Sequence, residues 1–106
     1  MPKYLIQGNY GGEGVKGLLK EGGSGRRAAV EELIGAGGGK VEAFYYAFGE
    51  TDVFVIAELP DNVTAAALSM FVNATGAVAI KATVLLSAEE IDEAAKKPIH
   101  YRAPGQ

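Results

Sequence analysis

The chain has 106 residues, of which 48% are hydrophobic and 22% charged, a composition typical of one folded domain with no room for a second. Its formal net charge is -3 and no basic stripe is present, so we expect no nucleic-acid partner. The absence of cysteine excludes disulfides, thiolate metal sites and a cysteine nucleophile. No apolar run is long enough to span a bilayer or to form the core of a signal peptide, so we expect no membrane partner and a cytoplasmic location.

The first part of the chain predicts a strand followed by a broken helix. Residues 3–10 alternate as a strand does, and residues 11–12 end it. A short amphipathic helical turn follows, and the glycine-rich stretch 22–25 breaks or offsets the helix, with Ser24 as a plausible N-cap of a second segment. The apolar residues at helical spacing in the two segments are Val15, Leu18 and Leu19, then Ala29, Val30, Leu33 and Ile34.

The remaining elements are a hairpin, a helix, a strand and a terminal helix. Residues 40–48 and 52–59 are strand-like and are joined by three residues, so they must be antiparallel. A helix over 62–74 is expected to carry Leu68, Phe71 and Val72 on one side, and a last strand covers 77–86. Residues 87–90 form a capping box for a short helix that runs to Lys97, and residues 98–106 are predicted to be an extended tail.

This order predicts a single α+β domain over 1–106 with a ferredoxin-like βαββαβ arrangement, a four-stranded antiparallel sheet and a C-terminal helix. The strands carry apolar residues on both faces, although the helices of one copy can cover only one. We therefore expect a homodimer or a higher even oligomer, with sheets packed face to face as in a dimeric α/β barrel. The alternative is that the tail or the terminal helix folds back over the open face.

Six stretches of the sequence together carry a family resemblance: Tyr4 to Tyr10, Glu13 to Leu19, Gly38 to Val41, Phe44 to Gly49, Asp52 to Ile56, and Pro60-Asp61. As a set they resemble the GYD domain family, small ferredoxin-like proteins of mostly unassigned function. The resemblance covers nearly the whole chain, and one departure is Thr51, which stands where the tyrosine of the family's naming motif is expected. It implies a ferredoxin-like protomer and a dimeric α/β barrel, and it implies no particular activity.

Two glycine-rich stretches have the composition of anion-binding loops. Residues 12–17 match the G-x-G-x-x-G pattern of dinucleotide-binding folds, but the hairpin rules out the parallel sheet that such a site requires, so tight turning and close packing are the better interpretation. Ser24, Arg26 and Arg27 are weak candidates for an anion site at a helix start, and a solvated loop is the favoured alternative.

Polar side chains on otherwise apolar strands are the main ligand-binding candidates. A polar residue inside a barrel must be paired or must hold a ligand, and related barrels hold ligands between sheet and helices. His100 is the only histidine, so we expect no metal site and no cofactor. The candidates are Gln7, Asn9, Tyr45, Asp52, Glu58 and Lys81.

Two functions remain open from the sequence. The first is a homo-oligomeric module that binds a small apolar ligand or serves a structural role. The second is a cofactor-independent oxygenase or isomerase that uses a tyrosine, asparagine or aspartate as proton shuttle.

Overall fold

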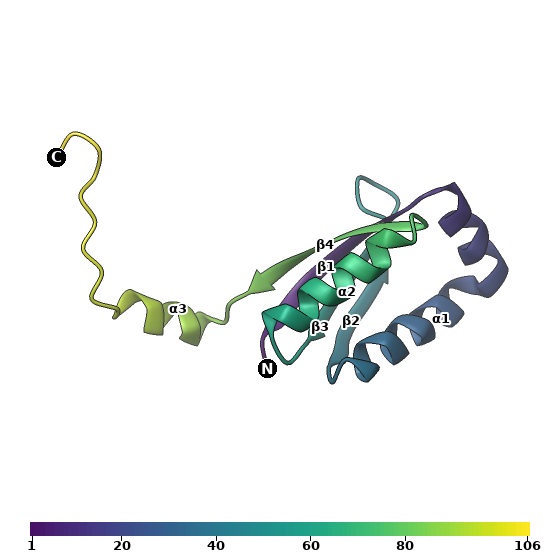
Figure 1. Cartoon of the computed structure of the whole chain (residues 1–106), viewed down its shortest axis with the longest axis horizontal. Helices are drawn as coiled ribbons and strands as arrows, with labels where there is room; N and C mark the ends of the chain where they lie inside the picture. The colour runs from purple at the N-terminus through teal and green to yellow at the C-terminus, as the bar shows by residue number, and fades with distance from the viewer.

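A computed structural model describes residues 1–106 and has four strands and three helices (Figure 1). All strand neighbours are antiparallel, in the order β2-β3-β1-β4. The predicted α+β ferredoxin-like fold is therefore confirmed. In chain order the elements are β1 (Lys3–Tyr10), α1 (Gly12–Ala36), β2 (Lys40–Tyr46), β3 (Val53–Glu58), α2 (Asn62–Ala74), β4 (Val78–Leu85) and α3 (Ala88–Ala95).

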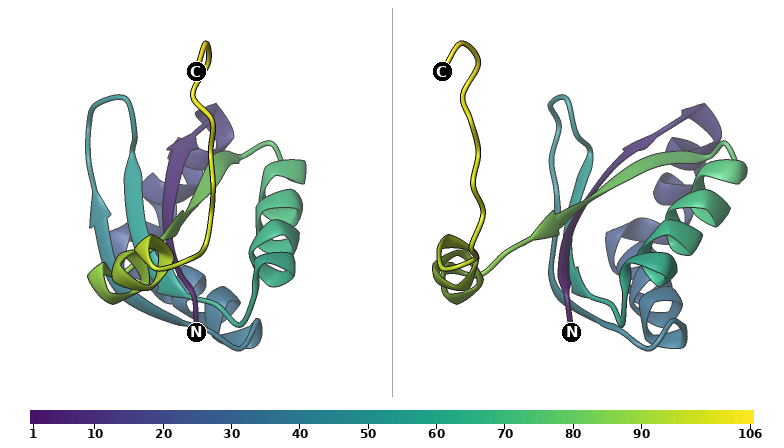
Figure 2. Two further views of the ribbon diagram at one scale, coloured as in Figure 1. Left: turned by 90° about the vertical axis from the view of Figure 1, so that its left-hand side faces the viewer. Right: turned by 60° about the vertical axis from the view of Figure 1, so that its left-hand side comes forward.

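The sheet has one covered face and one open face. Figure 2 shows α1 and α2 together on one side, whereas α3 and the tail stand off on the other side. The arm, as we name residues 86–106, does not fold back over the sheet, and every one of its residues is exposed. No helix of the structure combines the length and the apolar character that crossing a membrane requires.

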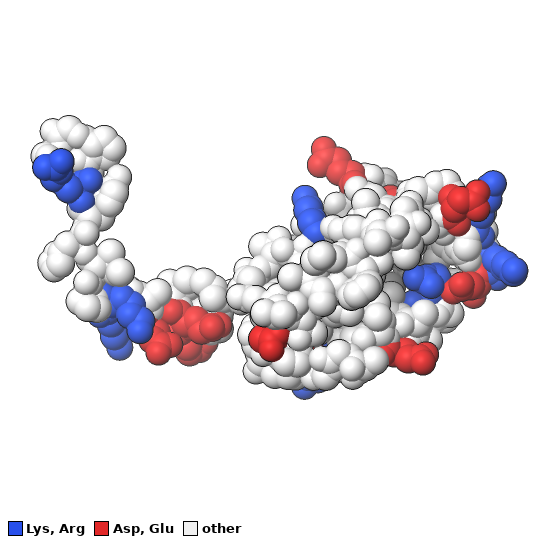
Figure 3. Space-filling model, viewed as in Figure 1, with Lys and Arg blue, Asp and Glu red and all other residues white.

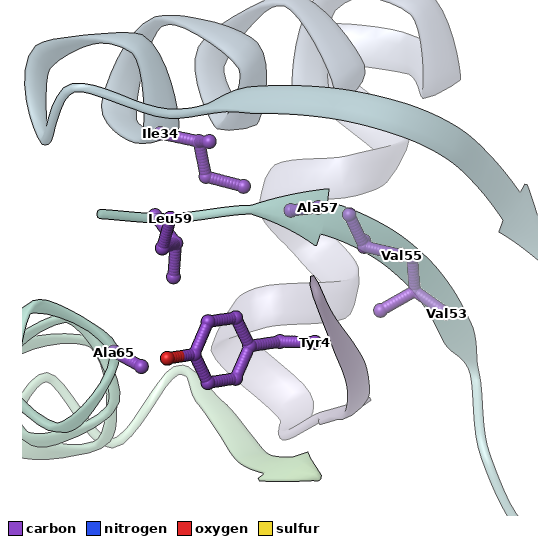
Figure 4. Close-up of a cluster of buried hydrophobic side chains, with 7 residues drawn as sticks. All are labelled: Tyr4, Ile34, Val53, Val55, Ala57, Leu59 and Ala65. Carbon is purple, nitrogen blue, oxygen red and sulfur yellow. The ribbon is translucent and has the colours of Figure 1, made fainter. Parts of the chain in front are cut away.

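The core lies between the sheet and the two helices. Val53, Val55 and Ala57 alternate along β3 and point to the covered face, because successive strand side chains face opposite ways (Figure 4). Ile34 of α1 and Ala65 of α2 close over them, and Tyr4 and Leu59 complete this buried cluster. Burial of each larger side chain contributes about 1.5–3 kcal/mol to folding.

A β-bulge changes the expected alternation of β2. The period of two in the sequence predicts that Glu42 shares a face with Phe44 and Tyr46, and that Val41 lies on the opposite face. This prediction is wrong for Val41 and Glu42, because the register shifts between Val41 and Ala43. The extra residue of the bulge turns Val41 toward the core, where it packs against the buried cluster, and leaves Glu42 to pair with Lys3 at 3.0 Å.

Two side-chain predictions on the helices were also wrong. Phe71 is 78% exposed, since Ala65, Leu68 and Val72 set the inward phase of α2. Leu19 points to solvent, while its neighbour Leu18 is half-buried.

The glycine-rich stretch 22–25 breaks α1 into two helical segments that meet at a kink, as predicted. The break is at Gly22, whose φ of 81° and ψ of 163° lie outside the helical range and kink α1. Ser24 lies two residues beyond this break, within the second segment, and is therefore not its N-cap, whereas the capping box at Ser87 and Glu90 is present as predicted. Element ends differ from the predicted ones by one or two residues.

Candidate functional site

An apolar cavity lies between the helix layer and the covered face of the sheet. Its volume is about 90 Å³, and Arg26 is its only charged lining residue. Strand side chains that point to the covered face form its floor, and residues of α1 and α2 form its roof. The apolar lining is Ile6, Tyr10, Val30, Leu33, Ile34, Phe44, Val53, Val55, Leu68, Val72, Val78 and Ile80.

An outer groove of about 360 Å³ continues from this cavity. The two share Tyr10, Arg26, Val72 and Val78, so the groove is the mouth of the cavity. Glu13, Glu21 and Thr75 add polar groups to the outer part. The cavity alone is smaller than the engineered void of about 150 Å³ that binds benzene, whereas sites for larger small molecules span about 300–1,000 Å³. A ligand would place only an apolar end in the cavity and the remainder in the groove.

Arg26 sits at the junction because of the phase of α1. It precedes Val30 by four residues and Leu33 by seven, so it shares their inward face. Its side chain is 30% exposed, and its nearest recorded carboxylate is Glu21 at 3.5 Å, on the other side of the kink at Gly22. This separation is long for a charge-assisted hydrogen bond, so guanidinium N–H groups remain available to an acceptor oxygen.

Two tyrosines flank the same region. Tyr46 donates a hydrogen bond from its hydroxyl to the carbonyl oxygen of Gly23 at 3.0 Å, which ties β2 to the kink of α1. Burial raises the pKa of Tyr46, and the neighbouring Tyr10 raises it further, while Arg26 and Arg27 oppose the shift. The phenol of Tyr46 therefore stays protonated at neutral pH.

The predicted ligand candidates lie outside this cavity. Asn9 accepts a hydrogen bond from the backbone N–H of Asp52 at 3.0 Å, and the Asp52 carboxylate accepts one from the Tyr10 backbone at 3.0 Å. These contacts join the end of the hairpin to β1. Gln7 contacts the Thr51 hydroxyl at 3.4 Å, a long hydrogen bond at the same end of the sheet.

The remaining three candidates are spread over the sheet. Glu58 is paired with Lys40 at 3.3 Å, and its side chain is only 17% exposed. Tyr45 is 70% exposed on the open face. Lys81 reaches a shallow groove beside Tyr4 and α2 at the β4 edge.

The three anion candidates are divided between two surfaces. Ser24 and Arg27 line a groove of about 340 Å³ together with Tyr45, whereas Arg26 faces the cavity. The kinked helix thus separates the two arginines by face, and the trio does not converge on one point. No group of three or more histidine, cysteine or acidic residues that could hold a metal ion is present.

The G-x-G-x-x-G stretch serves packing at Gly14. A β-carbon there would collide with the carbonyl oxygen of Ala77, so α1 approaches the start of β4 more closely than any other residue allows. Gly12 and Gly17 have nothing within 4 Å of such a carbon.

The sequence placed a ligand between sheet and helices but predicted neither the apolar lining nor a place for Arg26 at the mouth, because the ligand candidates were polar strand residues and Arg26 was a candidate only for an anion site with Ser24 and Arg27. The available signal was Arg26, a charged residue on the apolar stripe that continues through Val30 and Leu33. Tyr10 gave a weaker signal, as the last aromatic residue on the inward face of the first strand.

Comparison with known proteins identifies the family and nothing narrower. The model of the GYD domain matches residues 4–95, so the chain belongs to the GYD domain family. No curated protein and no solved structure matches the chain.

Proposed function

We propose that this member of the GYD domain family is a homo-oligomeric module that binds a small, largely apolar molecule. The observation that carries the proposal is the apolar cavity with one charged lining residue, Arg26, at the junction with an open groove. Small-molecule sites generally combine apolar walls with a few convergent polar groups, and this arrangement has both.

The chemistry of the mouth restricts the ligand. Arginine donates hydrogen bonds and never accepts them, so Arg26 selects a ligand whose polar end carries an acceptor oxygen. Glu13 and Glu21 line the same groove and disfavour a highly charged anion. A single carboxylate or carbonyl oxygen on an alkyl or ring-containing body fits both conditions.

Three eight-carbon probes test this binding mode: octanoate, octanol and octylamine, titrated into ¹⁵N-labelled protein. We expect saturable amide shifts around Val30, Val72 and Val78 with octanoate, weaker binding of octanol, and none of octylamine at this site. Arg26→Ala should weaken octanoate binding about tenfold and octanol binding by a smaller factor, because the hydroxyl accepts only a weaker hydrogen bond. Equal affinity for octanoate and octylamine would contradict the role of Arg26.

A matched pair of variants on α2 tests the location. Val72 lines both the cavity and its mouth, whereas Val63 is exposed on the outer side of the same helix. Val72→Phe should block the probes, and Val63→Phe should not. Shifts confined to the open face of the sheet, or equal loss in both variants, would remove the support for the cavity.

The oligomeric part of the proposal has a separate test. Leu5, Phe54 and Ile56 lie on the sheet face that no helix covers, and each is only half-buried. Native mass spectrometry of gently purified protein should give an even-numbered oligomer, and added mass would identify a retained ligand. A monomer at micromolar concentration would contradict assembly without affecting the cavity.

The alternative is a cofactor-independent oxygenase or isomerase. Tyr10 supports it, since this tyrosine lines the cavity, where a phenol can serve as a proton shuttle for a bound substrate. A retained ligand whose mass changes during incubation, with loss of that change in Tyr10→Phe but intact binding, would favour the enzyme.

A further inference from the structure

The arm leaves the body on the open side of the sheet without covering it. β4 ends at Leu85, and Figure 2 shows α3 and the tail held away from the sheet, opposite α1 and α2. A groove of about 760 Å³ lies between the arm and the sheet of the same chain. Its lining includes Leu86, Ser87 and Glu90 from the arm, and Lys3, Glu42 and Ile56 from the sheet. The arm and the open face are thus two walls with space between them.

The single chain exposes far more surface than a compact protein of its size. Its accessible surface is 7419 Å², whereas a compact folded chain of 11.0 kDa exposes about 5,600 Å². Its radius of gyration is 17.0 Å, against about 13 Å for a compact domain of this length. The excess of roughly 1,800 Å² is about twice what each partner of a standard interface buries, roughly 800 Å².

The arm itself needs a surface to pack on. α3 has eight residues, and isolated helices shorter than about 12 residues are marginal in water. Ala88, Ile91 and Ala95 form one apolar stripe along it, while Figure 3 shows acidic side chains gathered on the same helix. Beyond α3, Ile99 and Tyr101 are nearly fully exposed. Apolar groups thus recur along the whole arm.

In a homo-oligomer whose open sheet faces pack together, the open face of a second copy would occupy this space, and we propose that each arm crosses over to pack against that partner. A two-fold axis brings the two open faces together and at the same step brings each arm to the other copy. One contact then covers both apolar surfaces that a single chain leaves exposed. The inference rests on the homo-oligomer of the proposed function and goes beyond it by assigning the arm to the partner.

Spin labelling of the full-length chain distinguishes the partner from the arm's own copy. The protein has no cysteine, so Glu93→Cys on the acidic side of α3 accepts a single nitroxide. In one sample, ¹⁵N-labelled unmodified chain is mixed with excess unlabelled nitroxide chain, so the signal reports the partner's arm. In the second sample the nitroxide chain carries ¹⁵N and unmodified chain is in excess, so the signal reports the chain's own arm.

We expect broadening of β2 and β3 amides to be stronger in the first sample than in the second. Stronger broadening in the second sample would show that the arm folds back on its own sheet. Broadening confined to α2, or absent from both samples, would equally overturn the crossed arm.

Dimer affinity gives an independent test with matched substitutions. Ile91→Gln removes the largest apolar side chain of the α3 stripe. Glu93→Gln introduces the same residue, a good helix former, on the opposite side of the same helix. Ile91→Gln should weaken dimerisation about tenfold for each arm, hence about a hundredfold for a symmetric dimer, while Glu93→Gln has little effect.

The outcomes separate the two proposals. If the unmodified chain is monomeric, the oligomer and the crossed arm both fail. If it is dimeric and Ile91→Gln dimerises as tightly as Glu93→Gln, the oligomer stands and the crossed arm is refuted. Binding of octanoate in the cavity tests neither of them.

Discussion

Gly14→Ala is the most direct test of how the first helix packs on the sheet. A β-carbon at position 14 would meet the carbonyl oxygen of Ala77 well inside contact distance, and it would also approach the Tyr10 ring at 3.1 Å. Because Ala77 contributes backbone and not a flexible side chain, α1 and the start of β4 must move apart. The same carbonyl accepts the hydrogen bond from Gly11 N–H at 2.9 Å, so this movement also strains the turn into α1.

The expected cost follows from two opposing effects. Overpacking costs about 1–3 kcal/mol, whereas replacing a helical glycine by alanine gains up to about 1 kcal/mol. A clash with backbone belongs at the upper end, so we expect Gly14→Ala to lower the free energy of unfolding by about 2 kcal/mol. Gly17→Ala, three residues further along α1 with nothing within 4 Å, should raise it by a few tenths to about 1 kcal/mol.

Urea unfolding followed by circular dichroism at one fixed protein concentration measures both variants. Opposite signs for Gly14→Ala and Gly17→Ala would support a packing role for this glycine motif. A Gly14→Ala protein as stable as Gly17→Ala would refute the close approach of α1 to β4.

Three further predictions concern side chains that make specific hydrogen bonds. Tyr4 is buried and its hydroxyl donates to Asn62 Oδ1 at 2.6 Å, so Tyr4→Phe should lower the free energy of unfolding in urea by about 1 kcal/mol. Burial, and to a lesser extent Asp61, raises the pKa of Tyr4. The free energy of unfolding should therefore fall as pH rises above the ordinary tyrosine pKa of 10.0, and it should fall less in Tyr4→Phe. Asp61→Ala should lower the Tm, because the Asp61 carboxylate caps α2 by accepting hydrogen bonds from the backbone N–H and the hydroxyl of Thr64. These hydrogen bonds lower the pKa of Asp61, so the stabilisation is present above the ordinary pKa of 3.8 and is lost as pH falls below it. The same dependence of Tm on acid pH in Asp61→Ala and in the unmodified chain would contradict this. Asn73 pairs through its side-chain amide with both backbone groups of Ile80 on the β4 edge, so Asn73→Ala should increase light scattering on warming, while Asn73→Gln tests whether the longer amide can replace it.

The sequence was sufficient to predict the element order because its signals for the ends of strands and helices are strong. The three-residue joint between two apolar strands required a hairpin, and Ser87 with Glu90 signalled the start of α3 by itself. The bulge at Glu42 was not predictable in the same way. A period of two cannot show where one extra residue enters a strand, and the shift depends on the pairing of β2 with β3.

The site was harder to predict because it consists mainly of apolar residues. Ile34 and Val55 read as ordinary core residues in the sequence, and only the assembled layers show that space remains beside them. Asn9 and Asp52 attracted attention because they are polar, yet their hydrogen bonds are made within the chain. Polarity on a strand therefore indicated where backbone groups needed partners, and Arg26 on an apolar helical face was the better indication of a mouth.

The two faces of the sheet carry different consequences for every stability measurement above. The covered face is closed by α1 and α2, so changes at Gly14 or Tyr4 act within one chain. The open face and the arm stay exposed in the single chain, and a contact formed only between folded copies stabilises them by mass action. If copies associate through these surfaces, the unfolding midpoint must rise with protein concentration, and Ile91→Gln must reduce that rise. An unfolding midpoint that is independent of protein concentration over a hundredfold range would instead show that association with a second copy does not stabilise the folded chain.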